Sequence, residues 1–275
     1  MQTNLWRIEG DSVKLSLHPG QSKAWRSEKR FPFIIAGTQG GKTSFGPWWL
    51  RREIQKHGAG DYLAVTASFD LFKLKMLPEM RMVFETVLDI GRWWAGERVI
   101  ELKDPETGKF HAKRSDDPMW GRIILRSAQS KGGLESATAK AAWLDECGQD
   151  GFTLEDWEAV QRRLSLNQGR ALGTTTPYNI GWLKSEIYDP WRDGTDPDVE
   201  VINFPSTMNP LFPQAEYDRM EAKMQTWRFQ MFYDGLLVRP AGLIYDAFNS
   251  SFLVDRFPIP DGWPRAVGID FGGAN

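Results

Sequence analysis

The sequence has a single cysteine, Cys147, and almost no excess of charge of either sign. One cysteine excludes an internal disulfide, which fits a reducing compartment. There are 34 Lys and Arg against 36 Asp and Glu, for a formal net charge of -2. This balance argues against a protein that coats nucleic acid through bulk charge, although it leaves room for a local basic patch. No apolar run reaches about 18 residues, and no apolar signal segment precedes a cleavage site, so neither a membrane span nor a secretory leader is predicted.

Apolar strand-like runs alternate with helical stretches along the chain. This alternation predicts an α/β fold with a mostly parallel sheet flanked by helices. The predicted strands are 33–36, 62–66, 98–102, 122–127, 141–144, 170–174 and 199–204. The predicted helices are 43–56, 69–87, 154–164, 182–188 and 214–232. Two polar, turn-rich stretches are predicted loops, the first of them a hairpin or an exposed loop: 104–120 and 189–198.

The stretch IIAGTQGGKTS, residues 34–44, nearly matches a phosphate-binding loop, Gly followed by four residues and Gly-Lys-Thr/Ser. Ala36 occupies the first Gly position, and Gly37 is expected to supply the unusual backbone angles instead. A strand, a loop and a helix in this order would surround phosphates with backbone N–H groups. Lys42 would reach the β- and γ-phosphates, and the Thr43 hydroxyl would hold Mg²⁺. The predicted ATP-binding residues here are Gly37, Thr38, Gln39, Gly40, Gly41, Lys42, Thr43 and Ser44. The alternative is a surface turn with a solvated lysine.

Two further strands end in residues suited to phosphate chemistry. In AAWLDEC, residues 141–147, Asp145 could bind Mg²⁺ and Glu146 could orient and deprotonate the attacking water. The alternative is a strand that runs into a solvated acidic turn. In LGTTTP, residues 172–177, Thr174, Thr175 and Thr176 would lie at the same sheet edge and could sense the γ-phosphate. The alternative for that run is a β-strand stopped by proline.

A glutamine lies upstream of the loop in the tetrapeptide His18-Pro19-Gly20-Gln21. Its amide can both accept from and donate to an adenine edge, so Gln21 is a candidate base reader. A capping or loop role is an equally good interpretation.

In this order, the motifs resemble the ATPase domain of the large terminase subunit of tailed double-stranded DNA bacteriophages, a DNA-packaging motor. The resemblance rests on residues 18–21, 37–43, 145–146 and 174–177, and continues through 209–210, 233–235 and 242–248. It implies a P-loop NTPase fold of the ASCE type, ATP and Mg²⁺ as ligands, and coupling by Thr174, Thr175 and Thr176. It also implies ATP hydrolysis that drives viral DNA into a procapsid in the host cell cytoplasm. The implied partners are duplex DNA, contacted at its phosphates, a portal protein, a small terminase subunit, and further copies of the chain in a ring.

The resemblance also predicts the domain organisation. Residues 1–256 would form the ATPase domain, with a lid or linker subdomain over about 205–256. Residues 257–275 would be a linker and the first strand of an RNase H-like nuclease domain, whose metal-binding residue would be Asp270. We therefore expect a fragment that does not cleave DNA, because one carboxylate does not complete a metal site.

One departure concerns the arginine that, in many relatives, acts in a neighbouring active site. The matching turn here, residues 131–136, carries Glu135 at that position. Other candidates for the positive group are Arg126, Lys131, Lys140, Arg162 and Arg163, and we select Arg163 as the catalytic cation, from the same or a neighbouring subunit. Basic positions that could line a DNA pore, or simply be solvated, are Lys73, Lys75, Arg81, Lys109, Lys113, Arg114 and Lys131.

Three other classes of protein compete with this interpretation. A helicase-like or repair ATPase shares the core but needs strand-separating elements, which are not recognisable here. A small-molecule kinase does not require a glutamate beside the Mg²⁺-binding acid. A nucleotide-gated assembly protein with a decayed site would explain Ala36 and the absent arginine.

Overall fold

The computed structural model describes residues 5–10, 12–110, 120–129, 138–238, 257–258 and 260–263. The chain divides into two compact units, Met1–Arg239 and Pro240–Asn275. In the second unit the Phe257 and Trp263 rings pack edge to face, with centroids 6.2 Å apart. Across the described residues, no helix has the length and apolar character needed to cross a bilayer. The predicted boundary at residue 256 lies where the chain is not described, so it stays a prediction.

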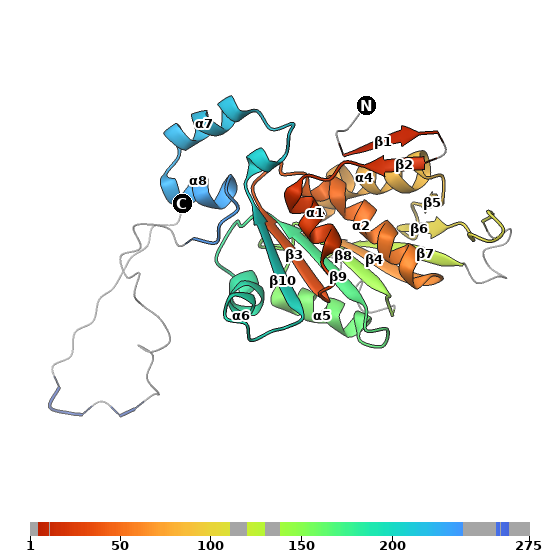
Figure 1. Ribbon diagram of the computed structural model, residues 1–275. Helices are drawn as coiled ribbons and strands as arrows, with labels where there is room; N and C mark the ends of the chain where they lie inside the picture. The colour runs from red at the N-terminus through yellow and green to blue at the C-terminus, as the bar shows by residue number, and fades with distance from the viewer. Residues whose placement is uncertain are drawn as a thin grey trace. The chain divides into compact units, whose positions relative to one another are not determined.

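An eight-stranded sheet forms the centre of the first unit (Figure 1). Its order is β10 (Val199–Phe204), β3 (Phe31–Ala36), β9 (Arg170–Thr175), β8 (Ala141–Asp145), β4 (Gly60–Thr66), β7 (Gly121–Ser127), β6 (Val99–Leu102) and β5 (Gly91–Trp94). The first six strands are parallel, while β6 and β5 run antiparallel at one edge. The predicted mostly parallel α/β sheet is therefore confirmed, because continuous apolar runs such as 31–36 are buried on both faces.

Helices cover both faces of the sheet and divide the core into two clusters. Ile34 packs with α1 (Pro19–Arg26), α2 (Lys42–His57) and the helical segment 69–87 on one face. Its neighbour Ile35 points to the other face, where α5 (Leu154–Leu164) and η3 (Leu183–Tyr188) pack. The predicted bounds of α5 are confirmed at both ends, and its capping box of Thr153 and Asp156 explains why it begins there.

Several elements differ from the sequence prediction. A hairpin of β1 (Trp6–Glu9) and β2 (Ser12–Leu15), the edge strand β5 and helix α1 were not predicted. The predicted helix 214–232 is wrong as a single element, since it breaks into α7 (Gln214–Lys223) and α8 (Thr226–Phe232) after a short 3-10 helix, η4 (Ser206–Met208). The predicted loop 189–198 begins with a helical turn, α6 (Asp189–Arg192), because Pro190 suits the first turn of a helix.

The predicted helix 69–87 is present, but its turns alternate in type. It consists of α3 (Phe69–Leu71), the π-helix η1 (Phe72–Met76), α4 (Leu77–Arg81) and the π-helix η2 (Met82–Val87). Ser68 caps its start by accepting a hydrogen bond from the Leu71 N–H at 3.3 Å. The wide π turns change which side chains face the sheet, and a periodicity of 3.6 does not predict them.

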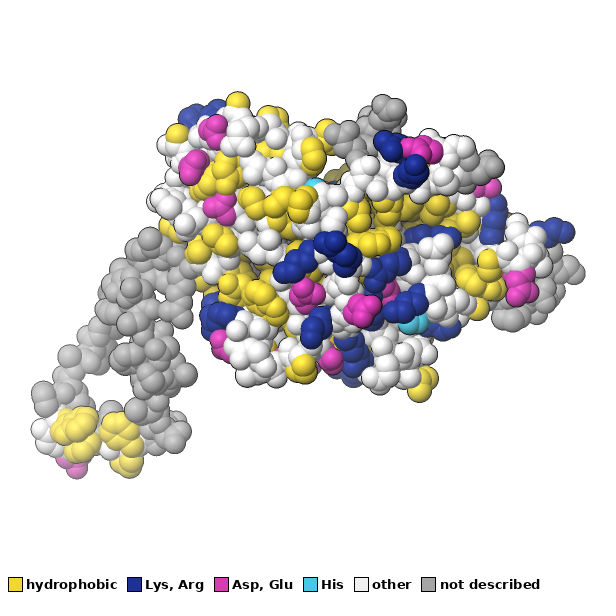
Figure 2. All heavy atoms as spheres, viewed as in Figure 1, with side chains coloured by type: hydrophobic (Ala, Val, Ile, Leu, Met, Phe, Trp, Pro, Cys, Tyr) yellow, Lys and Arg dark blue, Asp and Glu magenta, His cyan; other side chains and the backbone are white. Residues whose placement is uncertain are grey.

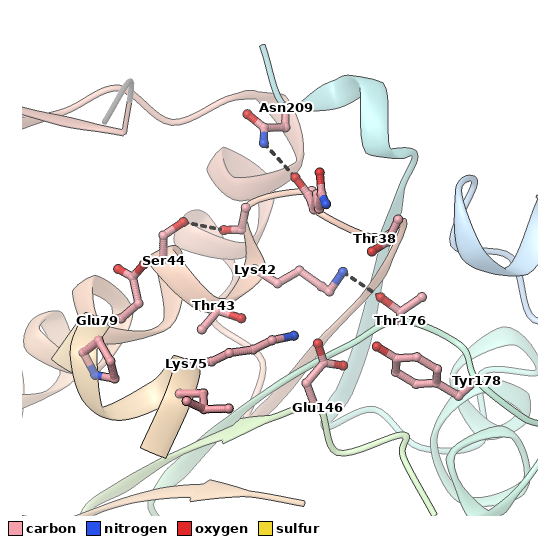
Figure 3. Close-up of a pocket in the computed structure, with 15 residues that line it drawn as sticks. Thr38, Lys42, Thr43, Ser44, Lys75, Glu79, Glu146, Thr176, Tyr178 and Asn209 are labelled. Atoms are coloured by element: carbon pink, nitrogen blue, oxygen red, sulfur yellow. Dashed lines mark hydrogen bonds between the residues drawn. The ribbon is translucent and has the colours of Figure 1, made fainter. Parts of the chain in front are cut away.

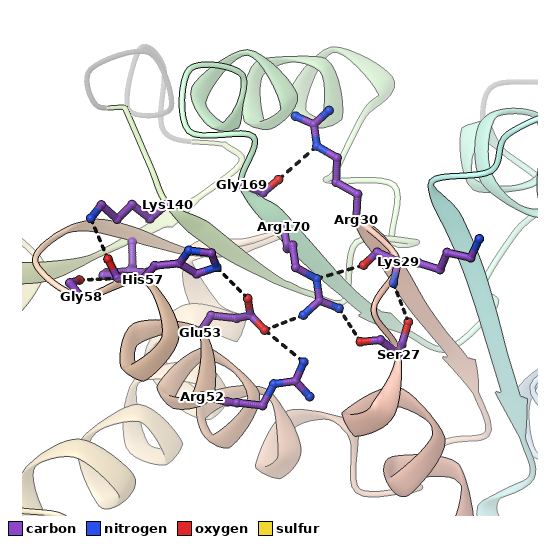
Figure 4. Close-up of polar contacts among 11 residues, drawn as sticks. Ser27, Lys29, Arg30, Arg52, Glu53, His57, Gly58, Lys140, Gly169 and Arg170 are labelled. Carbon is purple, nitrogen blue, oxygen red and sulfur yellow. Dashed lines mark hydrogen bonds and ion pairs between the residues drawn. The ribbon is translucent and has the colours of Figure 1, made fainter.

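A buried ionic network ties the end of α2 to the start of β9 (Figure 4). Arg170 donates from Nη1 to Glu53 Oε1 at 2.6 Å, and it also donates to the carbonyl oxygens of Ser27 at 2.7 Å and Lys29 at 3.0 Å. Arg52 and His57 approach the same carboxylate at 3.3 and 3.4 Å. Both elements carry site residues at their other ends, so this network sets the spacing between them.

Candidate active site

A cavity of about 490 Å³ opens where the carboxyl ends of the central strands meet (Figure 3). A volume of this size is typical of a small-ligand site. The loop after β3, the end of β8 and the end of β9 form its floor, and the segment after β4 forms one wall. The lining residues are Thr38, Gln39, Gly40, Gly41, Lys42, Thr43, Ser44, Leu74, Lys75, Pro78, Glu79, Glu146, Thr176, Tyr178 and Asn209. Seven consecutive predicted ATP-binding residues thus face one cavity.

The loop takes its shape from two left-handed residues. Gly41 has φ of 81° and Gln39 has φ of 55°. The expectation that Gly37 supplies the unusual angle is therefore wrong, because Gly37 is outside the left-handed region. Gly37 matters for close approach instead, since a Cβ there would collide with the backbone of Tyr233 and Ser206. Ala36 is tolerated because it is simply the last residue of β3.

The loop presents donors toward the cavity. Helix α2 begins at Lys42, and no side chain caps its amino end. Within the described residues, the N–H groups of Gln39 and Gly41 donate to no protein acceptor. Uncapped N–H groups at a helix amino end, with no acid in the first turn, suit an anion.

Segments C-terminal to β10 hold the loop from behind. The Thr38 N–H donates to Phe232 O at 2.7 Å, and Ser206 Oγ donates to Thr38 O at 2.6 Å. Asn209 Nδ2 donates to Gln39 O at 2.7 Å. The motif residues 209 and 233–235, singled out by resemblance alone, therefore contact or adjoin the phosphate loop.

Lys42 is folded back into the protein rather than extended into the cavity. Its ammonium donates to Ala36 O at 3.0 Å, Gly37 O at 2.7 Å and Thr176 Oγ1 at 3.0 Å. Burial lowers the pKa of Lys42 to about 8, and the nearby carboxylates of Glu146 and Asp145 oppose this effect. All three protons are used, so binding a phosphate would exchange at least one of these bonds.

The acids at the end of β8 lie beside the amino end of α2. Thr43 Oγ1 donates to Asp145 Oδ1 at 3.4 Å, and Thr174 Oγ1 donates to the same oxygen at 2.8 Å. Burial raises the pKa of Asp145, and the charge of Glu146 raises it further. Two adjacent buried acids with a hydroxyl fit a divalent cation. Since the described residues contain no cluster of three or more His, Cys, Asp or Glu, phosphate and water would have to complete its coordination.

Glu146 is held in a strained position at the cavity wall. Its φ is 55°, a left-handed angle that is uncommon for a residue with a side chain and is typical of functional positions. The side chain is buried, and its Oε2 has no hydrogen-bond partner among the described residues. Tyr178 is the neighbour that holds the other side of this carboxylate and of Thr176 through its hydroxyl. Burial, with the charge of Glu146, raises the pKa of Tyr178 to about 12, so it is a neutral donor.

The three predicted coupling threonines are buried side by side and contact different parts of the site. Thr174 bonds to Asp145, Thr176 accepts from Lys42, and Thr175 Oγ1 accepts from the Gly148 N–H at 3.0 Å. The end of β9 thus touches both acids' strand and the phosphate loop. This arrangement fits the predicted coupling role, which stays a prediction.

Gln21 holds the loop in this structure. Its Nε2 donates to Gly41 O at 3.0 Å, and its Oε1 accepts from the His18 N–H at 3.3 Å in a capping box. His18 Nε2 lies 3.1 Å from Gly40 O. The capping interpretation is therefore the one observed, and the adenine-reading role of Gln21 stays a prediction.

The predicted positive groups do not line the cavity. Arg163 follows the helix back to the opposite end of β8, where its carbonyl accepts from the Ala139 N–H at 2.9 Å. Arg162 lies beside it, paired at 3.9 Å with Glu158. Arg126 donates to carbonyl oxygens of 97, 98 and 125, and Lys140 donates to His57 O at 2.8 Å. Arg163 could therefore act only in another subunit; Lys131, Glu135 and Asp270 lie outside the described residues.

Sequence reasoning did not assign Tyr178, Lys75 or Asn209 to the nucleotide pocket. Tyr178 follows the threonine run by two residues, so its distance from the motif could have suggested it. Lys75 gave no such signal, because a π turn determines its direction. Lys75 was instead a candidate for a DNA pore, and the cavity wall is where the structure places it.

No family model matches the sequence, and no curated protein matches it. Among solved structures, the large terminase ATPase domain of Thermus phage P74-26 superposes with a TM-score of 0.65 and 19% identity, covering 82% of this chain and 95% of that one. The large terminase of a second thermophilic bacteriophage gives 0.67 and 13%, covering 86% of this chain and 57% of that one. The complex of that second terminase with ADP gives 0.64 and 15% over the same shares. The chain therefore has the fold of the ATPase domain of phage large terminases.

Proposed function

We propose that this chain hydrolyses ATP to drive double-stranded viral DNA into a procapsid, as the motor domain of a large terminase subunit. One observation carries the proposal. In a terminase ATPase fold, a phosphate-loop lysine, two adjacent acids and a hydroxyl-rich strand end converge on one cavity.

The site suits ATP with Mg²⁺. The second thermophilic phage terminase, which shares this fold, has been solved with ADP and with ATP-gamma-S. Here the N–H groups of Gln39 and Gly41, with the amino end of α2, would receive phosphate oxygens. Thr43 and Asp145 would hold Mg²⁺, and the cation would neutralise charge on the phosphates.

Glu146 is the group best placed to act on water. Its oxygen Oε2 is buried without a hydrogen-bond partner in the described part of the chain, so it can accept a proton or orient a water molecule. Tyr178 would orient the carboxylate. The left-handed backbone at Glu146 would turn the side chain out of the strand and into the cavity.

Coupling to movement would pass through the segments behind the loop. Thr38 is bonded to Phe232 and Ser206, and the Tyr178 and Phe232 rings lie 6.1 Å apart. A change at the phosphates would therefore displace η4 and α8, the described part of the predicted lid. Thr174 and Thr176 would report the same change from the sheet.

Duplex DNA would be contacted at its phosphates. Figure 2 shows Lys and Arg side chains gathered over α1 and the adjoining end of α2. The exposed members of this face, which we call the α1 basic face, are Lys23, Arg26, Lys29 and Lys56. Such a face fits a sequence-independent backbone contact. A portal protein, a small terminase subunit and a ring of copies on the capsid are further parts of the proposal, and all of it would take place in the host cell cytoplasm.

ATP turnover per chain, measured over a wide range of protein concentration with and without duplex DNA, tests this function. We expect turnover that DNA stimulates, with no unwinding of a duplex that carries a single-stranded tail. Turnover that rises with concentration would assign the missing cation to a neighbouring subunit. Strand separation would favour the helicase-like class, and nucleotide binding without turnover in any assembly state would favour a decayed site.

A further inference from the structure

The cavity holds a second cation that the sequence motifs do not include. Among the described lining residues, the positively charged side chains are Lys42 and Lys75. Lys42 is buried and donates all three ammonium protons to protein oxygens. The Lys75 ammonium makes no hydrogen bond and no ion pair within the described residues, although the residue is exposed. The cation available to a ligand is therefore Lys75.

The fold places Lys75 at the cavity through the strand next to the acids. Thr66, at the end of β4, pairs in register with Asp145 of β8. The chain then turns at Ser68 into the helical segment that walls the site. Within the π-helix η1, Phe72 and Met76 are buried in the core and anchor the turn. Lys75 is consequently presented to the cavity by a fixed element.

The direction of the side chain suits a phosphate between the loop and the acids. In Figure 3, Lys75 extends across the cavity with its ammonium toward Glu146, on the side of Lys42 and Thr176. The charge of Lys75 also contributes to lowering the pKa of Lys42. Two lysines that face one cavity repel each other unless an anion lies between them, which fits a polyanionic ligand.

We propose that Lys75 is the catalytic cation that contacts the γ-phosphoryl group of ATP, and that it acts within its own chain. This inference rests on the proposed function. It replaces Arg163, which lies at the far end of β8, as the source of positive charge. It also explains how the site works with Glu135, rather than arginine, before the acidic strand.

The step balances without a redox partner. The oxygen of a water molecule forms a bond to the γ-phosphorus, and the bond from that phosphorus to the bridging oxygen of ADP breaks. The proton of the water passes to the Glu146 carboxylate and then to the released phosphate. Lys75 stays protonated and stabilises the negative charge on the γ-phosphoryl oxygens, a form of electrostatic catalysis.

The test compares Lys75→Met and Lys75→Arg with Lys73→Met as a matched control. Lys73 is exposed in the same π turn but does not line the cavity. Dissociation constants for ADP and for ATP-gamma-S are measured alongside turnover. We expect Lys75→Met to weaken ATP-gamma-S binding about tenfold or more and leave ADP binding within about twofold. Turnover should fall on the order of 10²-fold, with partial rescue in Lys75→Arg.

Mixing two defective chains tests the action within one chain. Lys75→Met and Glu146→Gln proteins should remain inactive when combined, whereas a lysine acting across an interface would restore turnover. Restored turnover, equal weakening of ADP and ATP-gamma-S, or wild-type values in Lys75→Met would each overturn the inference. A loss of DNA affinity alone would do so too, and would return Lys75 to a DNA-contacting role. If the unmodified chain binds neither nucleotide, the proposed function itself fails.

Discussion

Removing the buried arginine at the base of the sheet should destabilise the fold while sparing the nucleotide site. Arg170 pairs with Glu53, whose side chain is wholly buried, and donates to two backbone carbonyl oxygens. Arg170→Met keeps much of the volume but leaves the carboxylate without its closest partner. Breaking a buried pair from one side costs about 3–5 kcal/mol. A domain with a typical unfolding free energy of about 5–15 kcal/mol would lose a large part of it.

Urea unfolding followed by tryptophan fluorescence measures this loss. Arg162→Met is the matched control, because Arg162 forms an exposed pair with Glu158 at 3.9 Å and its loss should have a much smaller effect. The double variant Glu53→Leu with Arg170→Met should recover at least half of the loss, since it removes the orphaned charge. A single variant no weaker than the control, or two losses that simply add, would refute this reasoning. Below the unfolding transition, ATP affinity in Arg170→Met should stay near wild type.

Three further predictions concern the site. Because burial depresses the pKa of Lys42 to about 8, the unfolded chain binds more protons above that pH; unfolding free energy should therefore rise by about 2 kcal/mol from about pH 7.5 to about pH 9.5, relative to Lys42→Met, in urea titrations at both pH values. Tyr178→Phe should lower turnover about tenfold with little change in ATP affinity, because only the orientation of Glu146 is lost; an unchanged rate would contradict this role. Thr174→Val leaves the Trp143 N–H, now bonded at 3.0 Å, without an acceptor, and should cost about 1–3 kcal/mol in the same unfolding assay.

The parts of the fold that the sequence predicts are those with a strong local pattern. The run 31–36 is apolar throughout because β3 is buried on both faces, and helix 154–164 carries both an amphipathic pattern and a capping box. Helix α1 was missed although His18, Pro19 and Gln21 form a capping box and an N-terminal proline. Its signal was taken for a base-reading motif, which shows that one tetrapeptide can fit two interpretations.

The remaining features depend on contacts between distant residues. The break between α7 and α8 and the π turns of 72–76 and 82–87 follow from tertiary packing, which overrides a weak helical preference. The loop contacts of Ser206 and Asn209 join residues about 170 positions apart. The strand-end chemistry at Asp145 and Glu146 was predictable because parallel strands bring their carboxyl ends to one edge. The direction of Lys75 was not, because it depends on how one wide turn packs.

Glu146→Gln tests the central claim most directly. The amide keeps the size of the side chain but cannot take a proton from water, so ATP binding and hydrolysis should separate. Glu155→Gln, a change to an acid near the start of α5 and away from the cavity lining, is the control. In one experiment with radiolabelled ATP, bound nucleotide and released phosphate are measured for each protein with and without duplex DNA. We predict that Glu146→Gln binds ATP as the wild type does and releases no phosphate above background. Phosphate release at the wild-type rate would contradict the account.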